Sequence, residues 1–89
     1  MNAPASPPVQ REIRVQYFAV LREQAGRGSE ALATAASTPS ELYEELRGTR
    51  GLTFPRSMLR VAVNEEFCDW DRPLQDGDHI VFIPPVAGG

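Results

Sequence analysis

The residues best suited to chemistry stand at the C-terminus, where Pro84-Pro85-Val86-Ala87 leads to Gly88-Gly89. Each proline fixes φ at about −65° and favours an extended chain, and six extended residues span at most about 20 Å. Glycine is used where backbone must approach another group closely. We therefore predict that residues 84–89 form a flexible arm that places the Gly89 carboxylate in a narrow channel for activation, with Gly88 as a steric requirement beside it.

Other catalytic patterns are missing from the sequence. It has no Gly-rich phosphate loop, no CxxC pair, no HExxH motif and no Gly-x-Ser-x-Gly motif. The single histidine, His79, follows a turn and is interpreted as a surface residue. The single cysteine, Cys68, is interpreted as a small space-filling residue of a strand, and one cysteine can build neither an intramolecular disulfide nor a cysteine metal site. We expect no catalytic side chain and no metal ligand in this chain.

Composition narrows the class of protein. The 89 residues suffice for one small domain, and 42% of them are hydrophobic. A net charge of −3 argues against nucleic acid as a partner. No apolar run approaches the ~18 residues of a membrane span, and no signal-peptide pattern is present, so we expect a cytoplasmic protein without membrane contact. All nine basic residues are arginines, so no lysine of the chain can attack an activated C-terminus.

Local patterns divide the chain into a disordered leader at 1–10, a folded domain at 11–83 and the arm at 84–89. Apolar alternation or strand-like composition predicts strands at 13–17, 30–36, 59–63, 67–68 and 79–83. A short helical turn is predicted at 19–25.

The principal helix is predicted to begin at Thr38-Pro39-Ser40-Glu41. Thr38 is suited to the N-cap, Pro39 to the first helical position, and Glu41 to a capping box. Leu42 and Leu46 would share the buried face. Gly48 is expected to end the helix, and 51–58 to form a loop. The result is an α+β domain: a mixed sheet of four to five strands with one main helix on one face. With the first and last strands as central neighbours, this is the order of a β-grasp, ubiquitin-like fold.

The last strand predicts a binding surface. Ile80 and Phe82 point to one face of the sheet and Val81 and Ile83 to the other, so neither face is polar. If Phe18 joins Val81 and Ile83, the three form an exposed apolar patch at the root of the arm, and such patches usually mark partner interfaces.

Trp70 is interpreted as a lid over the core. The acidic stretch 65–78 is interpreted as a solvated turn region, with a docking face for a basic partner as the alternative.

Several segments resemble a known family. They are Val15-Gln16-Tyr17-Phe18-Ala19, Leu21-Arg22-Glu23, Val61-Ala62-Val63-Asn64, Pro73-Leu74-Gln75-Asp76-Gly77-Asp78 and Phe82-Ile83-Pro84-Pro85-Val86-Ala87-Gly88-Gly89. Through them the chain resembles the small, sulfur-carrier subunits of molybdopterin synthase, a ubiquitin-like family, from Ile13 to Gly89. The terminal string is the most specific of the five.

The resemblance implies a mechanism. An ATP-dependent adenylyltransferase/sulfurtransferase would convert Gly89 to a glycyl adenylate and then to a thiocarboxylate (1-thioglycine). The arm Pro84–Gly89 would enter the large, catalytic synthase subunit in a heterotetramer, where two sulfur transfers build the dithiolene of molybdopterin. The chain would be a non-catalytic sulfur donor that binds no cofactor permanently, since the ATP belongs to the activating enzyme.

Two alternatives stay open from the residues. The chain could serve another pathway, such as thiamine or cysteine synthesis, with the same chemistry at Gly89. The pair Pro84-Pro85 argues against the thiamine carriers. It could instead be a ubiquitin-like modifier that conjugates Gly89 to lysines of other proteins.

Overall fold

The computed structural model describes residues 10–85. Residues 1–9 of the predicted leader, and Val86, Ala87, Gly88 and Gly89 of the predicted arm, lie outside the described residues. The elements follow in the order β1 (Arg11–Tyr17), α1 (Val20–Ala25), β2 (Ser29–Thr34), α2 (Pro39–Arg50), the 3₁₀ helix η1 (Arg56–Met58), β3 (Arg60–Val63), β4 (Glu66–Cys68) and β5 (His79–Ile83).

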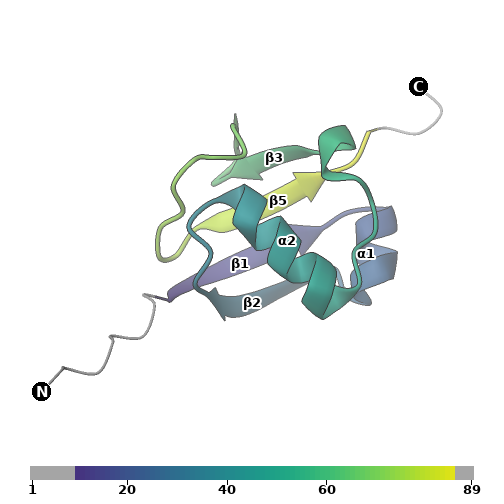
Figure 1. The fold of residues 1–89 in the computed structure, drawn as a ribbon, viewed down its shortest axis with the longest axis horizontal. Coiled ribbons are helices and arrows are strands. Elements are labelled where there is room, and N and C mark those ends of the chain that lie inside the picture. The colour runs from purple at the N-terminus through teal and green to yellow at the C-terminus, as the bar shows by residue number, and fades with distance from the viewer. Residues whose placement is uncertain (1–9, 86–89) are drawn as a thin grey trace, which may run out of the picture.

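The five strands form one mixed sheet in the order β2-β1-β5-β3-β4 (Figure 1). The central strands β1 and β5 are parallel, with Val15 opposite Ile80 and Tyr17 opposite Phe82, and the other neighbours are antiparallel. Helix α2 lies across one face of this sheet. This arrangement confirms the predicted α+β class, the β-grasp topology and the central pairing of the first and last strands.

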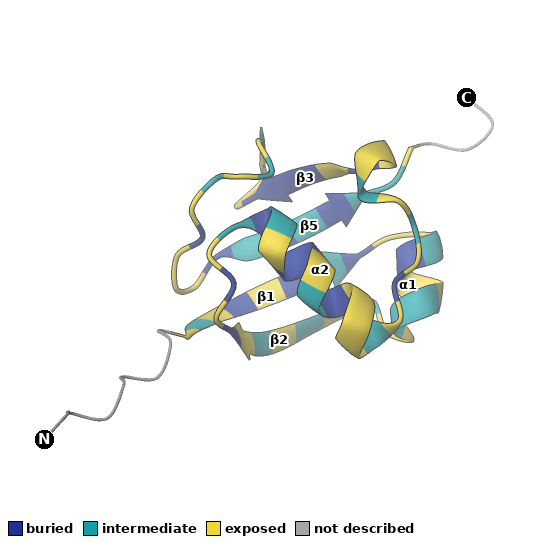
Figure 2. Ribbon diagram, viewed as in Figure 1, coloured by how far each residue is buried: buried dark blue, intermediate teal, exposed yellow. Residues whose placement is uncertain are grey.

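The sheet buries one face against α2. Inward residues of the central strands, among them Val15, Ile80 and Phe82, are fully buried together with Leu42 and Leu46 of the helix (Figure 2). The predicted buried face of the helix is therefore confirmed. Trp70 covers this core as expected, because its ring stacks on Phe82 at a centroid distance of 5.7 Å.

Helix α2 begins as the sequence predicts and ends later. Thr38 is the N-cap, and its side chain accepts a hydrogen bond from the Glu41 backbone N–H. In a standard capping box the Glu41 carboxylate would accept a hydrogen bond from the N–H of the N-cap residue. Here it accepts one at 2.8 Å from the N–H of Ser37, one residue earlier. The prediction that Gly48 ends the helix is wrong. The helix continues to Arg50, and Gly51 takes the left-handed conformation (φ 72°) that ends it.

Strand β2 also differs from its prediction at 30–36. It ends at Thr34, whose hydroxyl accepts a hydrogen bond from the Ala36 N–H at 3.0 Å. This local turn takes Ala36 out of the sheet and into the core, where it is buried.

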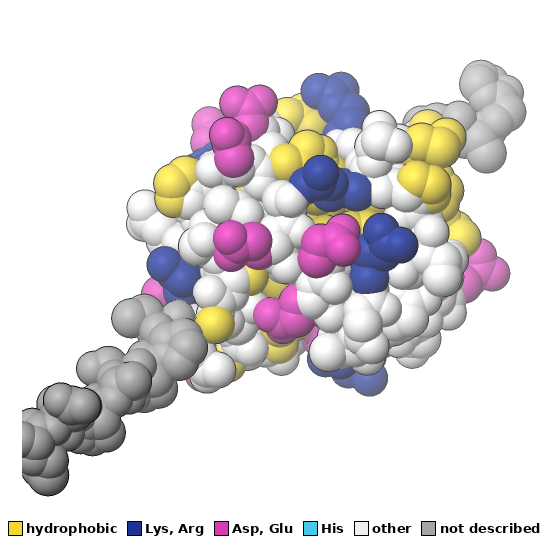
Figure 3. Space-filling model, in the orientation of Figure 1, with side chains coloured by type: hydrophobic (Ala, Val, Ile, Leu, Met, Phe, Trp, Pro, Cys, Tyr) yellow, Lys and Arg dark blue, Asp and Glu magenta, His cyan; other side chains and the backbone are white. Residues whose placement is uncertain are grey.

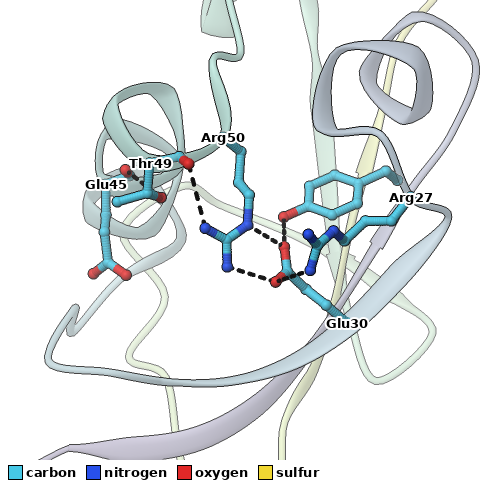
Figure 4. A network of polar contacts seen from close by, with 6 residues as sticks. Arg27, Glu30, Glu45, Thr49 and Arg50 are labelled. Atoms are coloured by element: carbon cyan, nitrogen blue, oxygen red, sulfur yellow. Dashed lines mark hydrogen bonds and ion pairs between the residues drawn. The ribbon is translucent and has the colours of Figure 1, made fainter.

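The α2 side of the molecule carries acidic and basic side chains close together (Figure 3). Part of this charge is built into the fold. Glu30 of β2 is nearly buried and accepts hydrogen bonds from Arg50 and from the Tyr17 hydroxyl, and Arg27 lies on its other side (Figure 4). The network joins β2, β1 and the end of α2.

Candidate functional site

The root of the C-terminal arm is the candidate site. Strand β5 lies in the centre of the sheet between β1 and β3, and it ends at Ile83. Pro84, directly after this strand, is half-buried, and Pro85 is exposed. The role predicted for Gly89 falls outside the described residues, so the structure bears only on the surface around the root.

The structure places the three predicted interface residues on this surface. Val81 and Ile83 lie on the sheet face opposite α2 and are half-buried, while Ile80 and Phe82 are fully buried on the other face. Phe18, one residue beyond β1, is 44% exposed. The three predicted residues therefore lie on the side of the sheet away from α2, where the start of α1 adjoins Phe18 and Ile83.

Sequence reasoning missed a fourth apolar residue on this face. Phe67 of β4 is 59% exposed and pairs with Ala62, which in turn pairs with Val81. Partners opposite one another in a sheet share a face, so these side chains form a row across the outer surface. The guanidinium of Arg60 lies 4.1 Å from the centre of the Phe67 ring. The strand alternation of Glu66-Phe67-Cys68 carried the signal for this position.

Beside the root, the fold also forms an apolar groove of about 720 Å³. Its walls come from three segments: Phe18, Ala19 and Val20; Phe54 and Met58; and Ile83, Pro84 and Pro85. Phe54 and Met58 were not predicted as site residues, because residues 51–58 were predicted as a loop, whereas 56–58 form the 3₁₀ helix η1.

Hydrogen bonds hold the loop wall of this groove in place. The Tyr43 hydroxyl of α2 donates to the Phe54 carbonyl at 2.6 Å, and burial raises the Tyr43 pKa, so this donor stays protonated at neutral pH. The side chain of Gln24 makes two hydrogen bonds to Thr53, one to its hydroxyl and one from its N–H. The loop is therefore fixed to both helices.

Backbone strain lies next to the groove. Ala19, the N-cap of α1, has φ 53° and ψ −127°, a conformation that costs a residue with a Cβ about 1–3 kcal/mol. It turns the chain sharply between Phe18 at the end of β1 and Val20 at the start of α1. The strained residue therefore stands at the turn that directly follows the exposed Phe18.

Cys68 and the acidic stretch 65–78, which the sequence analysis also considered, contribute to the fold. Cys68 is half-buried in β4 and packs against the core, as expected. Within the acidic stretch, Asp78 is buried and accepts hydrogen bonds from Asn64 and the Gln75 N–H, so this acid holds a turn in place. Residues 10–85 contain no cluster of three potential metal ligands, and none of their helices is long and apolar enough to cross a membrane.

Comparisons with known proteins agree with this geometry. The model of the ThiS family matches residues 15–89. The molybdopterin synthase sulfur carrier subunit of Escherichia coli (strain K12) is 34% identical over 80 residues, which cover 86% of this chain and 99% of that protein. The protein of the same name from Homo sapiens is 31% identical over 83 residues, with coverages of 88% and 94%.

Solved structures extend the likeness. A complex of subunits 1 and 2 of molybdopterin-converting factor from Helicobacter pylori 26695 contains a chain 30% identical to this one, with a TM-score of 0.61 and coverages of 88% and 99%. The structure of SAMP1 from Haloferax volcanii has a TM-score of 0.71 with coverages of 88% and 99%, but at 22% identity it shows the shared fold alone.

The family resemblance seen in the sequence is thus confirmed over most of the chain by the family model and by relatives above 30% identity. The chain belongs to the ThiS family and, within it, to the molybdopterin synthase sulfur carrier subunits.

Proposed function

We propose that this chain is the sulfur carrier of a molybdopterin synthase and that it carries sulfur as a thiocarboxylate on Gly89. The observation that supports this most strongly is the family match, which continues through residue 89 and so includes the terminal Gly88-Gly89. Relatives that bear the sulfur-carrier name align over nearly their whole length.

The chemistry follows from the weakness of a carboxylate as an electrophile. A Gly89 oxygen attacks the α-phosphorus of ATP on the activating enzyme, pyrophosphate leaves, and a glycyl adenylate forms. A sulfur nucleophile at the oxidation level of sulfide then attacks the carbonyl carbon and AMP leaves. The thiocarboxylate product remains ionised at neutral pH and needs no cysteine of the carrier. Because the chain lacks lysine, no ε-amine of its own competes for the adenylate.

The surface at the root of the arm fits a partner that receives the terminus. The patch of Phe18, Val81 and Ile83 adjoins the groove at the point where Pro84 follows β5, because Phe18 and Ile83 also line the groove together with Phe54 and Met58. Apolar surfaces of this kind are suited to burial in an interface. We propose that the large synthase subunit covers them, admits Pro84–Gly89 to its active site, and supplies the catalytic side chains.

The same terminus must also reach the activating enzyme. The two partners therefore bind in turn, and the carrier acts as a shuttle between them in the cytoplasm. In the synthase itself we propose a heterotetramer of two carriers and two large subunits, in which two sulfur transfers complete one dithiolene.

Intact-mass measurement tests the proposal. Incubation with the activating enzyme, ATP and sulfide should add about 16 Da, as sulfur replaces one oxygen. Deletion of Gly89 should abolish both the mass change and the delivery of sulfur to the large subunit, with unchanged thermal unfolding. The control is a chain that lacks residues 1–9 and so is shortened at the N-terminus instead. It should react normally.

Two results would contradict the proposal. Undiminished sulfur delivery by the chain lacking Gly89 would remove the terminus from the chemistry. Gly89 found in amide linkage to lysines of other cellular proteins would favour the protein-modifier alternative.

A further inference from the structure

A second hollow, of about 340 Å³, opens on the outer face of the sheet near the start of β5. Arg14 and Gln16 of β1 line it together with Ser29 of β2, His79 of β5 and Arg22 of α1. The strand register explains how they meet, because Arg14 lies opposite His79 and Gln16 opposite Ser29. The Arg22 side chain reaches the hollow by lying against Gly28, a residue without a side chain.

The lining of this hollow is cationic in a chain of net charge −3. None of the residues that line it is acidic. The ion pairs found among residues 10–85 involve Arg27, Arg47, Arg50 and Arg72, but neither Arg14 nor Arg22. Glu12 lies on the same face of β1, two residues before Arg14, but it is exposed and does not line the hollow. The two guanidinium groups are therefore available to an external anion.

His79 supplies an independent indication. The interpretation of His79 as a surface residue is wrong, because the residue is half-buried and its Nε2 atom is buried without a hydrogen-bond partner within the described part of the chain. Its backbone N–H is fixed by a hydrogen bond to the Asn64 side chain at 3.0 Å. Buried polar atoms of native proteins are nearly always paired. His79, which lies opposite Arg14 and lines the same hollow, therefore has a ring nitrogen that residues 10–85 leave without a partner.

We propose that this hollow receives a carboxylate side chain of the protein partner that covers the apolar patch. The proposal rests on the proposed function and adds a polar contact to its interface. Phe18 lines both this hollow and the apolar groove at the root of the arm, so a partner seated on one reaches the other. Arginine binds carboxylates through paired N–H donors, and an Asp or Glu side chain at the rim of an interface fits an open hollow of this size.

The arrangement divides the work of recognition. The apolar patch provides burial, which is largely indifferent to which apolar partner surface covers it. Charged groups at the rim act on the association rate and on the choice between partners, and their effect falls as salt screens them. The contact between Arg14 and the partner therefore accelerates and selects association with the large subunit.

The test is a kinetic measurement of binding to the large subunit from the same organism at low and high salt. Arg14→Gln should weaken binding about tenfold at low salt, chiefly through slower association, and the difference should shrink at high salt. Arg47→Gln is the matched control, because it makes the same charge change on the far helix. It should stay within about twofold of the unmodified chain. Urea unfolding of both variants checks that they are folded.

Each contrary result has a distinct meaning. Equal effects of Arg14→Gln and Arg47→Gln would show a general charge effect and overturn the proposed contact, as would no effect of either. Binding of acetate or phosphate that is lost in Arg14→Gln, while the affinity of this variant for the large subunit is unchanged, would assign the hollow to a free anion and overturn the partner carboxylate. Failure of the unmodified chain to bind the large subunit at all would overturn the proposed function itself.

Discussion

The Glu30 carboxylate accepts two hydrogen bonds from the Arg50 guanidinium, at 2.7 Å from Nε and 2.6 Å from Nη2. The two residues are twenty positions apart and join an outer strand of the sheet to the last turn of α2. The Glu30 side chain is 7% exposed and also accepts a hydrogen bond from the Tyr17 hydroxyl at 2.6 Å. This paired geometry fixes the end of the helix against β2, close to the glycine that ends the helix.

Removal of the Glu30 charge should destabilise the fold. Glu30→Gln leaves the partly buried Arg50 without its anion, so we expect the free energy of unfolding to fall by about 1–3 kcal/mol. Glu44→Gln, which removes an exposed acid 3.7 Å from Arg47, is the control and should change it by less than about 0.5 kcal/mol. Urea unfolding at neutral pH measures both.

The same pair gives a pH dependence. Its hydrogen bonds with Arg50 hold the Glu30 pKa below the ordinary value of 4.5. A group whose pKa is depressed by folding contributes stability that is complete above its unfolded pKa and is lost as the pH falls through the folded one. The stability difference between the unmodified chain and Glu30→Gln should therefore be constant from neutral pH down to about 5 and shrink below it. A difference that grows on acidification would contradict this assignment.

Two glycines near the end of α2 should respond oppositely to alanine. Gly48 is inside the helix with open space where a Cβ would lie, so Gly48→Ala should stabilise the protein by about 0.5–1 kcal/mol. Gly51 has equal space but φ 72°, so Gly51→Ala should destabilise it by about 1 kcal/mol. Thermal unfolding measures both signs. Equal effects at the two sites would mean that Gly51 does not need its left-handed conformation.

These glycines show where sequence reasoning reached its limit. Thr38 and Pro39 gave a correct helix start because capping is decided within four residues. Gly48 and Gly51 both suit a helix end, and the choice between them depends on tertiary contacts, including the one that Arg50 makes with Glu30. A local pattern contains no information about that distant carboxylate.

In the candidate site, too, some features could be predicted from local sequence and others depend on tertiary contacts. The apolar patch could be predicted, since a strand with Val81 and Ile83 on one face and Ile80 and Phe82 on the other must expose apolar surface in a two-layer fold. The groove could not, because Phe54 and Met58 reach it only through a loop held by Tyr43 and Gln24. Those contacts join segments that are eleven and twenty-nine residues apart.

The patch should be separable from the core by one substitution. Ile83→Asp places a charge on the outer face, where Ile83 is only half-buried, so the isolated chain should fold with a modest loss of stability. Binding to the large subunit should weaken at least tenfold, because an unpaired charge is costly at the centre of an interface. Ala33→Asp, on the exposed outer face of β2 and outside both the patch and the hollow, is the control for a new acid on the same sheet and should bind normally. Unfolding of the isolated Ile83→Asp chain would instead place this residue in the core.

The groove can be tested apart from the patch through η1. Met58 is 56% exposed and lines the groove, whereas its neighbour Ser57 is exposed and does not. Met58→Glu and Ser57→Glu therefore add the same charge to the same short helix, and neither should change the stability of the isolated chain by more than about 0.5 kcal/mol. If the large subunit fills the groove when it receives the arm, Met58→Glu should weaken binding severalfold and Ser57→Glu should not. Calorimetric titration against the large subunit measures the two affinities. Equal affinities would confine the interface to the sheet face and leave the groove outside it, since the only difference between the variants is the surface on which the new carboxylate lies.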